Sequence, residues 1–137
     1  MGKIIVIGSQ KGGVGKTTTT LNLAYSLREM GKKVLTVDFD SQANLTTCYG
    51  VEDTGVLEYT IGHLMMAQIE EEVTESFEDY IQSRDGVDYL PSSIYLSVVV
   101  LLSHMVKRMP AISNFGLIRF LIFPTILRKS CKGDDRL

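Results

Sequence analysis

Residues 11–18 read Lys-Gly-Gly-Val-Gly-Lys-Thr-Thr, and they lie between an apolar run at 4–7 and a helical pattern that begins near Lys16. Glycines in such a loop can take the positive φ angles that turn successive backbone N–H groups toward one point. The helix that follows adds its unpaired N-terminal amides and the positive end of its dipole. This stretch predicts a loop that holds the phosphates of a nucleotide.

The residue types in this loop match the roles that nucleotide binding requires. Lys16 would neutralise the β- and γ-phosphates, and the Thr17 hydroxyl is placed to ligate Mg²⁺. The strict P-loop pattern requires glycine at position 10, where this chain has Gln10, but the variant K-G-G-x-x-K-[ST] fits without exception. A Gly-rich turn with solvated lysines is the alternative, and the strand and helix expected on either side argue against it. The expected nucleotide-binding residues are Gly12, Gly13, Val14, Gly15, Lys16, Thr17 and Thr18.

The composition is that of one modest domain without a global attraction to polyanions. The chain has 137 residues, 45% of them hydrophobic, and a formal net charge of −2. Charge alone therefore favours neither nucleic acid nor an anionic membrane as a partner. The two cysteines, Cys48 and Cys131, lack the spacing of a metal site or a disulfide framework. We expect a reducing, cytoplasmic setting.

The order of apolar runs and turn residues predicts an α/β fold. Residues 3–8 form an apolar run with β-branched residues, as expected for a strand buried on both faces of a parallel sheet. A helix that ends at Gly31 and a second strand at 33–37 would complete a right-handed βαβ unit. Further along we expect a loop at 46–53, a helix at 56–76, a short strand at 87–90, and a buried helix at 95–109, where three valines also permit a strand.

Two carboxylates, Asp38 and Asp40, directly follow the second expected strand. Ligands of open α/β sheets bind beyond the carboxyl ends of the strands, so this loop should face the phosphate loop. Carboxylates at i and i+2 of an extended backbone point to the same side. One would hold a metal-bound water, and the other would orient or deprotonate the attacking water. The alternative is a turn in which Asp, Ser and Asn side chains satisfy backbone amides.

Two motifs together resemble those of the ParA-type partition ATPases. The first covers residues 10–18, and the second, at 37–46, reads Val-Asp-Phe-Asp-Ser-Gln-Ala-Asn-Leu-Thr. Both are typical of the deviant Walker A class, which also contains the MinD-type division-site ATPases. The Gln-x-Asn-x-Thr tail of the second motif resembles the ParA branch more than the MinD branch. A weaker similarity continues through residues 86–97, so that the resemblance covers about residues 2–100.

The resemblance implies a P-loop NTPase-type parallel sheet with flanking helices, and an ATP hydrolase that binds ATP and Mg²⁺. It assigns Lys16 to the phosphates and Asp40 to the hydrolytic water. It assigns Thr17 and Asp38 to the metal shell. Lys11 is the signature lysine of the class, and it would reach the partner's phosphates across a nucleotide-sandwich homodimer, with the logic of an arginine finger. A ParB-like stimulating protein and non-specific DNA are the implied partners in chromosome or plasmid partitioning, and a membrane partner is not expected.

The similarity to this family ends after about residue 105. No acidic residue lies between Tyr89 and Gly133, whereas residues 89–137 carry seven of the 14 Lys and Arg. The family's later strand, which ends in Asp before a Pro-containing turn, is not found, since the apolar run at 117–123 meets Pro124 without an Asp. We therefore expect two parts. Residues 1–105 would be the N-terminal part of a P-loop ATPase domain that lacks the later strands, and residues 106–137 would be a basic, apolar tail.

This tail leaves more than one function open. In a truncated chain the tail would be foreign or out of frame, the first strand would be an unpaired hydrophobic edge, and the protein would be a catalytically inactive fragment. Alternatively, the tail would dock on DNA or on a membrane, as in a MinD-like membrane-associated ATPase. The iron–sulfur reductase branch of the class requires cluster cysteines, and neither cysteine lies in a matching context.

Overall fold

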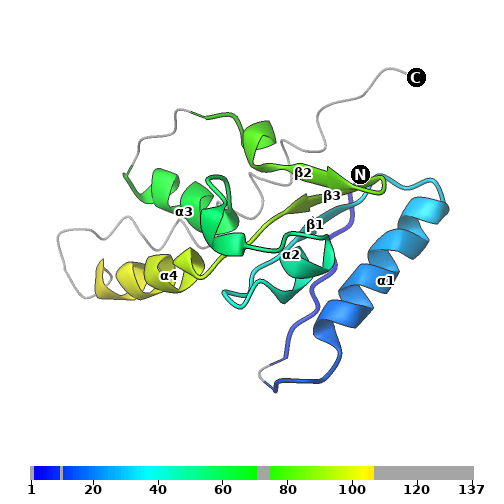
Figure 1. Cartoon of the computed structure of the whole chain (residues 1–137), viewed down its shortest axis with the longest axis horizontal. Coiled ribbons are helices and arrows are strands. Elements are labelled where there is room, and N and C mark those ends of the chain that lie inside the picture. Colours follow the sequence, from blue (N-terminus) through cyan, green and yellow to red (C-terminus); the bar gives the residue numbers. More distant parts are fainter. Residues whose placement is uncertain (1, 10, 71–74, 107–137) are drawn as a thin grey trace.

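The described residues form helices and short strands (Figure 1). The structure is a computed structural model that describes residues 2–9, 11–70 and 75–106. Its elements are α1 (Lys16–Glu29), β1 (Leu35–Val37), α2 (Asn44–Cys48), α3 (Ile61–Glu70), β2 (Gln82–Arg84), β3 (Val87–Leu90) and α4 (Tyr95–Val106). Two 3₁₀ turns, Thr54–Val56 and Phe77–Tyr80, flank α3. The predicted α/β class is confirmed. The tail predicted at 106–137 lies, apart from Val106, outside the described residues.

The sheet has three described strands in the order β1-β3-β2. Strand β1 pairs in parallel with β3, and β2 pairs with β3 in the antiparallel direction. The polar sequence of β2 does not predict a strand. Asp85 and Gly86 join it to β3, and both have positive φ angles, of 50° and 73°. A two-residue turn of this kind matches the twist of paired strands, so the sheet is mixed where a purely parallel one was predicted.

The strand predicted at residues 3–8 is wrong. Residues 2–9 belong to no strand, and the side chains of Ile4, Ile5 and Val6 are 58%, 59% and 79% exposed. A strand forms only where a neighbouring strand pairs with its N–H and C=O groups. A high content of β-branched residues does not form a strand without such a neighbour. Among the described residues, none outside this segment makes a backbone hydrogen bond with its residues 2–8. The βαβ unit expected from residue 3 is therefore not formed in this part of the chain.

Alternate residues of β3 fill two cores, one on each face of the sheet. Val87 and Tyr89 face α1 and α2, where they pack with Ala24, Leu45 and Tyr49. Leu90 faces the other way, toward a core built from α3, α4 and the turn after α3. That core contains Ile61, Leu64, Phe77, Tyr80, Leu90 and Leu96. Figure 1 shows α1 and the pair α3 and α4 on either side of the strands. The period-2 geometry of a strand explains this division.

Helix α1 ends where the sequence predicts. Gly31 has a φ of 73°, and the amides of Gly31 and Lys32 donate to the carbonyls of Arg28 and Leu27 at 2.9 and 3.0 Å. This pair of bonds is the Schellman arrangement, which satisfies carbonyls that a helix end otherwise leaves open. The prediction of Gly31 as the helix terminator is confirmed.

Helices α3 and α4 cross closely beside the second core. The helix predicted at 56–76 is shorter and starts at Ile61. The helical alternative for 95–109 is confirmed over Tyr95–Val106, but this helix is not buried along its length, since Val98 and Leu101 are 48% and 62% exposed. Gly62 lies at the crossing, where an added Cβ would come within 3.1 Å of the Leu96 backbone nitrogen. Because backbone atoms cannot turn away from such a contact, the close packing of these two helices requires glycine at this position.

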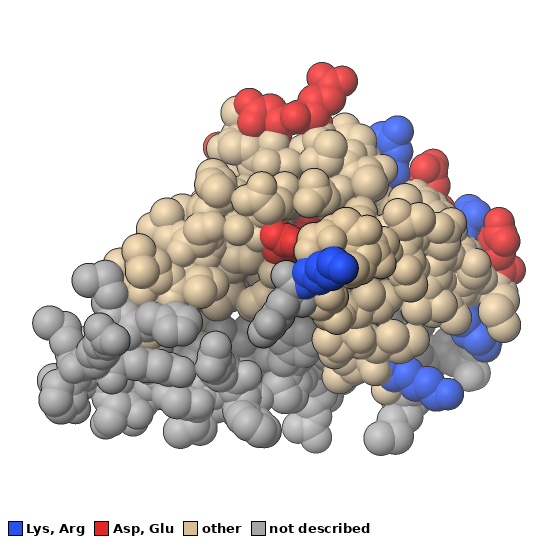
Figure 2. Space-filling view, turned by 90° about the horizontal axis from the view of Figure 1, so that it is seen from below, with Lys and Arg blue, Asp and Glu red and all other residues tan. Residues whose placement is uncertain are grey.

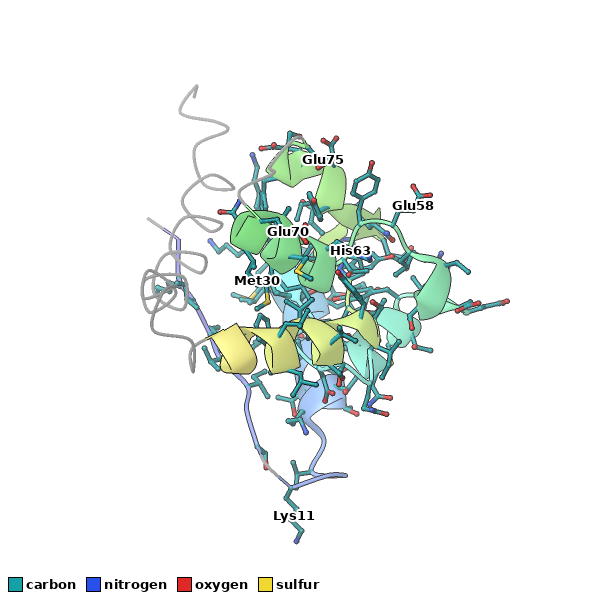
Figure 3. The ribbon with its side chains drawn as sticks, turned by 90° about the vertical axis from the view of Figure 1, so that its left-hand side faces the viewer. Lys11, Met30, Glu58, His63, Glu70 and Glu75 are labelled. Atoms are coloured by element: carbon teal, nitrogen blue, oxygen red, sulfur yellow. The ribbon has the colours of Figure 1, made fainter. Side chains whose placement is uncertain are left out.

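The imidazole of His63 lies beside α4 and should make stability depend on pH (Figure 3). Its ring stacks on Tyr95 with centroids 4.5 Å apart, and its Nδ1 is 2.9 Å from the Thr60 hydroxyl. Burial lowers the pKa of His63 below its usual value of 6.5, so the unfolded chain binds a proton more readily than the folded chain. Wild type should therefore lose stability relative to His63→Gln as the pH falls below about 6.5. Thermal unfolding of both proteins at pH 7.5, 6 and 5 measures this, and a difference that stays constant with pH would contradict it.

Candidate nucleotide site

The phosphate loop occupies residues 11–15, directly before α1. Gly13 and Gly15 have φ angles of 71° and 80°, in the left-handed region that glycine adopts without strain. A Cβ built on Gly12, Gly13 or Gly15 would meet no atom within 4 Å. The predicted positive φ is confirmed for Gly13 and Gly15, but Gly12 does not have one. The loop is therefore turned as expected, with open space around it.

The first turn of α1 is open to an anion. Gly15 is the N-cap residue, no side chain caps the helix, and no acidic residue lies in its first turn. The intrahelical ladder begins with the bond from the Thr19 amide to the Gly15 carbonyl, at 2.9 Å. The amides of residues 16–18 precede it and have no carbonyl partner within the helix. Lys16 and Thr17 are half-buried beside these amides, and Val14 and Thr18 are exposed. This end of α1 therefore combines free donors, the positive end of the dipole and a lysine.

Lys11 lies at the tip of the loop and extends away from the body of the protein (Figure 3). The side chain is exposed, and the backbone amide of Lys11 donates to the Ser9 hydroxyl at 3.2 Å. Among the described residues, no carboxylate forms an ion pair with it. An exposed cation on a glycine-rich loop is free to contact another molecule.

Asp38 and Asp40 follow β1 but have different surroundings. Asp38 is only 6% exposed and accepts three hydrogen bonds, from the Thr46 amide at 2.9 Å, the Thr46 hydroxyl at 2.7 Å and the Asp40 amide at 3.2 Å. Burial raises the pKa of Asp38, and the bonds from Thr46 oppose this shift. Asp40 is half-buried and accepts a bond from the Gln42 amide at 3.0 Å. The turn expected as an alternative is thus present, and Asp38 directs its carboxylate into the protein.

Thr46, predicted at the start of a loop, also belongs to this site. It lies in the short helix α2, is 0% exposed, and accepts a hydrogen bond from the Ser92 amide at 2.9 Å. Its two partners are 8 and 46 residues away in the sequence. The threonine in the Gln-x-Asn-x-Thr motif was the only signal that could have found it.

The two halves of the predicted site lie on different elements. The phosphate loop lies at the N-terminus of α1, and the two carboxylates lie at the carboxyl end of β1, against which α1 packs. No hydrogen bond or ion pair joins the loop to Asp38 or Asp40 within residues 11–70. Their meeting around one ligand stays a prediction.

The residues present fit a magnesium–nucleotide ligand. Mg²⁺ is usually bound through one or two protein oxygens together with phosphates and waters. Thr17 offers a hydroxyl at the helix start, and the described residues contain no group of three or more His, Cys, Asp or Glu that could hold a metal alone. Thr17 would supply one such oxygen, and the phosphates of a bound nucleotide would supply others.

On the face shown in Figure 2, the described basic side chains do not form one continuous patch. Acidic side chains gather at its upper edge, and others lie among the lysines and arginines along the right-hand side and near the centre. The described helices include none that is both long and apolar enough to cross a membrane. The surface of this face therefore gives no separate sign of a nucleic-acid site.

Comparisons with known proteins agree with the two motifs. Residues 2–115 match the AAA domain family. The sporulation initiation inhibitor protein Soj of Bacillus subtilis is 57% identical over 56 residues, which are 41% of this chain and 22% of that protein. The chromosome-partitioning ATPase Soj of Thermus thermophilus is 40% identical over 89 residues, 65% of this chain and 31% of that protein.

A solved structure extends the comparison to the fold. Cobyrinic acid a,c-diamide synthase from Mycobacterium smegmatis, with bound ATP analog and magnesium, is 31% identical with a TM-score of 0.62, over 72% of this chain and 38% of that chain. The present chain thus spans between 22% and 38% of the lengths of these three proteins.

Proposed function

We propose that this chain binds ATP with Mg²⁺ and acts as an ATP-dependent dimerising switch, because it belongs to the ParA-type partition ATPases. These AAA-domain proteins are part of the ParA/MinD superfamily, and the chain matches their N-terminal portion. The observation that carries this proposal is the uncapped start of α1 behind a loop with two left-handed glycines. The related synthase structure with an ATP analog and magnesium supports the same ligand.

The loop residues and α1 would hold the nucleotide. Backbone amides of Gly12, Gly13, Val14, Gly15 and Thr18 surround the phosphate position in this proposal, and Lys16 supplies the positive charge. Thr17 would contribute its hydroxyl to Mg²⁺, and the metal would neutralise phosphate charge.

The carboxylates after β1 would support hydrolysis. Asp40 is the residue proposed to orient the attacking water, since its second carboxylate oxygen has no described partner. Asp38 already accepts three protein hydrogen bonds. We therefore propose that Asp38 supports the groups that surround the metal and does not contact the metal directly.

The switch would act as a homodimer that encloses the nucleotide. Lys11, exposed at the loop tip, is proposed to reach the partner's phosphates, where a cation supplied in trans stabilises charge in the transition state. A ParB-like stimulating protein, non-specific DNA and a cytoplasmic location belong to this proposal through the family alone.

A fragment without catalytic activity is the second candidate. The observation that favours it is the exposed apolar segment at 4–6, which pairs with none of the described strands. Such a fragment would bind Mg-ATP weakly or not at all.

Titration of the chain with Mg-ATP, beside Lys16→Ala, tests the proposal. Removal of one charged contact to phosphate should weaken binding by about 10- to 100-fold. The matched control is Lys32→Ala, because Lys32 is an exposed lysine just beyond the opposite end of α1. Micromolar binding by wild type and Lys32→Ala, with loss in Lys16→Ala, supports the nucleotide site. No binding by wild type supports the inactive fragment, and equal binding by all three proteins would remove Lys16 from the site.

A further inference from the structure

We propose that Thr46 is a positioning residue, which fixes the loop that carries Asp40 and ties this loop to the segment before α4. The loop is defined here as residues 38–46, and it is called the Asp40 loop. Its role in hydrolysis rests on the function proposed above, whereas the positioning stands on the contacts of Thr46 alone.

The Thr46 hydroxyl is bonded in both directions. It donates to Asp38 Oδ2 at 2.7 Å and accepts from the Ser92 amide at 2.9 Å. The Thr46 amide donates to the same Asp38 oxygen at 2.9 Å, and Thr46 is 0% exposed. Because water does not reach these groups, a lost partner cannot be replaced from solvent.

The other oxygen of Asp38 extends this chain of bonds to Asp40. Asp38 Oδ1 accepts from the Asp40 amide at 3.2 Å, and the Asp40 carbonyl accepts from the Ala43 amide at 2.9 Å. Asp40 is therefore held on both sides of its Cα atom. Without the Thr46 hydroxyl, Asp38 would lose the shortest of its three hydrogen bonds, at 2.7 Å, and only the Thr46 and Asp40 amides would orient its carboxylate.

At its other end, this series of hydrogen bonds reaches Ser92, between β3 and α4. Ser92 comes two residues after the end of β3 and three before the start of α4, and it is 0% exposed. The Asp38 amide also donates to the Leu90 carbonyl at 3.1 Å, so the two strand ends are joined twice. A displacement of the Asp40 backbone would thus shift the backbone before α4, through the hydrogen bonds of Thr46.

Thr46→Val and Thr46→Ser separate the hydroxyl from the bulk of the side chain. Valine keeps the size of threonine and removes both hydroxyl bonds, and serine keeps the hydroxyl. Thr47→Val is the matched control, since Thr47 is the next residue of α2 and is exposed. Its hydroxyl donates to the Ala43 carbonyl at 3.0 Å and to no other described residue.

Amide hydrogen exchange of the full chain without nucleotide is the first measurement. The Asp40 and Ser92 amides should exchange about tenfold faster in Thr46→Val, while Thr46→Ser and Thr47→Val behave as wild type. In wild type, the Thr46 hydroxyl proton should be slow enough to give its own NMR resonance. If this resonance is absent, if Thr46→Val exchanges as wild type does, or if Thr46→Ser exchanges as fast as Thr46→Val, the proposal is wrong.

ATP turnover is the second measurement, and it distinguishes positioning from general loss of structure. Thr46→Val should lower kcat with little change in the KM for ATP, and Thr46→Ser should restore kcat. A rise in KM with unchanged kcat would contradict the role of Thr46 in placing Asp40. If wild type binds no Mg-ATP, the proposed function fails, and the exchange measurement still decides whether Thr46 holds the loop.

Discussion

Lys11→Ala should bind Mg-ATP with the affinity of wild type and lose ATP-dependent dimerisation and hydrolysis. Lys11 is exposed at the loop tip, its side chain contacts no described carboxylate, and it points away from the body of the protein (Figure 3). A cation in this place contributes nothing to the fold of its own chain. If it stabilises transition-state charge in a partner, its removal should reduce turnover by about 10³-fold or more.

Two measurements check this expectation separately. Light scattering with and without ATP reports the dimer, and phosphate release reports hydrolysis. Lys32→Ala again serves as the control for loss of one positive charge. Dimerisation and turnover at wild-type levels in Lys11→Ala would show that the lysine does not act across an interface.

Asp38→Ala should lower the free energy of unfolding by about 2–4 kcal/mol, because it leaves buried donors without an acceptor. The Thr46 amide and hydroxyl both lose their partner, and the Asp40 amide loses its own. Since a small domain is stable by only about 5–15 kcal/mol in total, the loss is a large share of its stability.

Urea denaturation at pH 7.5 measures this loss. Asp88→Ala is the matched control, because Asp88 lies on the neighbouring strand β3 with an exposed side chain. It should cost less than about 1 kcal/mol. Equal midpoints for the two variants would mean that the bonds to Asp38 contribute nothing to the stability of the fold.

The elements that the sequence predicts are those whose determinants are local. Gly31 ends α1 through carbonyls only a few residues away, and the apolar residues at 87–90 form β3. The strand expected at 3–8 depends on a partner that the described residues at 11–70 and 75–106 do not provide, so its composition predicted a strand that is not formed. Strand β2, Gln82–Arg84, is polar and exposed along most of its length, and its pairing comes from the turn at Asp85-Gly86.

The candidate site divides in the same way. The glycine angles and the open start of α1 follow from residues next to one another, and the loop motif predicts them. The environment of Asp38 does not follow from its neighbours, because its burial and its bonds depend on Thr46 and, through it, on Ser92. A period-2 argument placed Asp38 and Asp40 on one side, and long-range contacts gave them different surroundings.

The exposed segment at 4–6 has a consequence for synthesis of the protein. Residues 2–9 leave the ribosome before residues 11–106, yet none of the described residues offers them a strand. At the usual elongation rate, about 5–20 s pass while those later residues are made. During that time a β-branched run with three exposed apolar side chains is accessible to chaperones and to neighbouring nascent chains. Because the described residues offer this segment no strand, the yield of folded protein should depend on how long the segment is shielded.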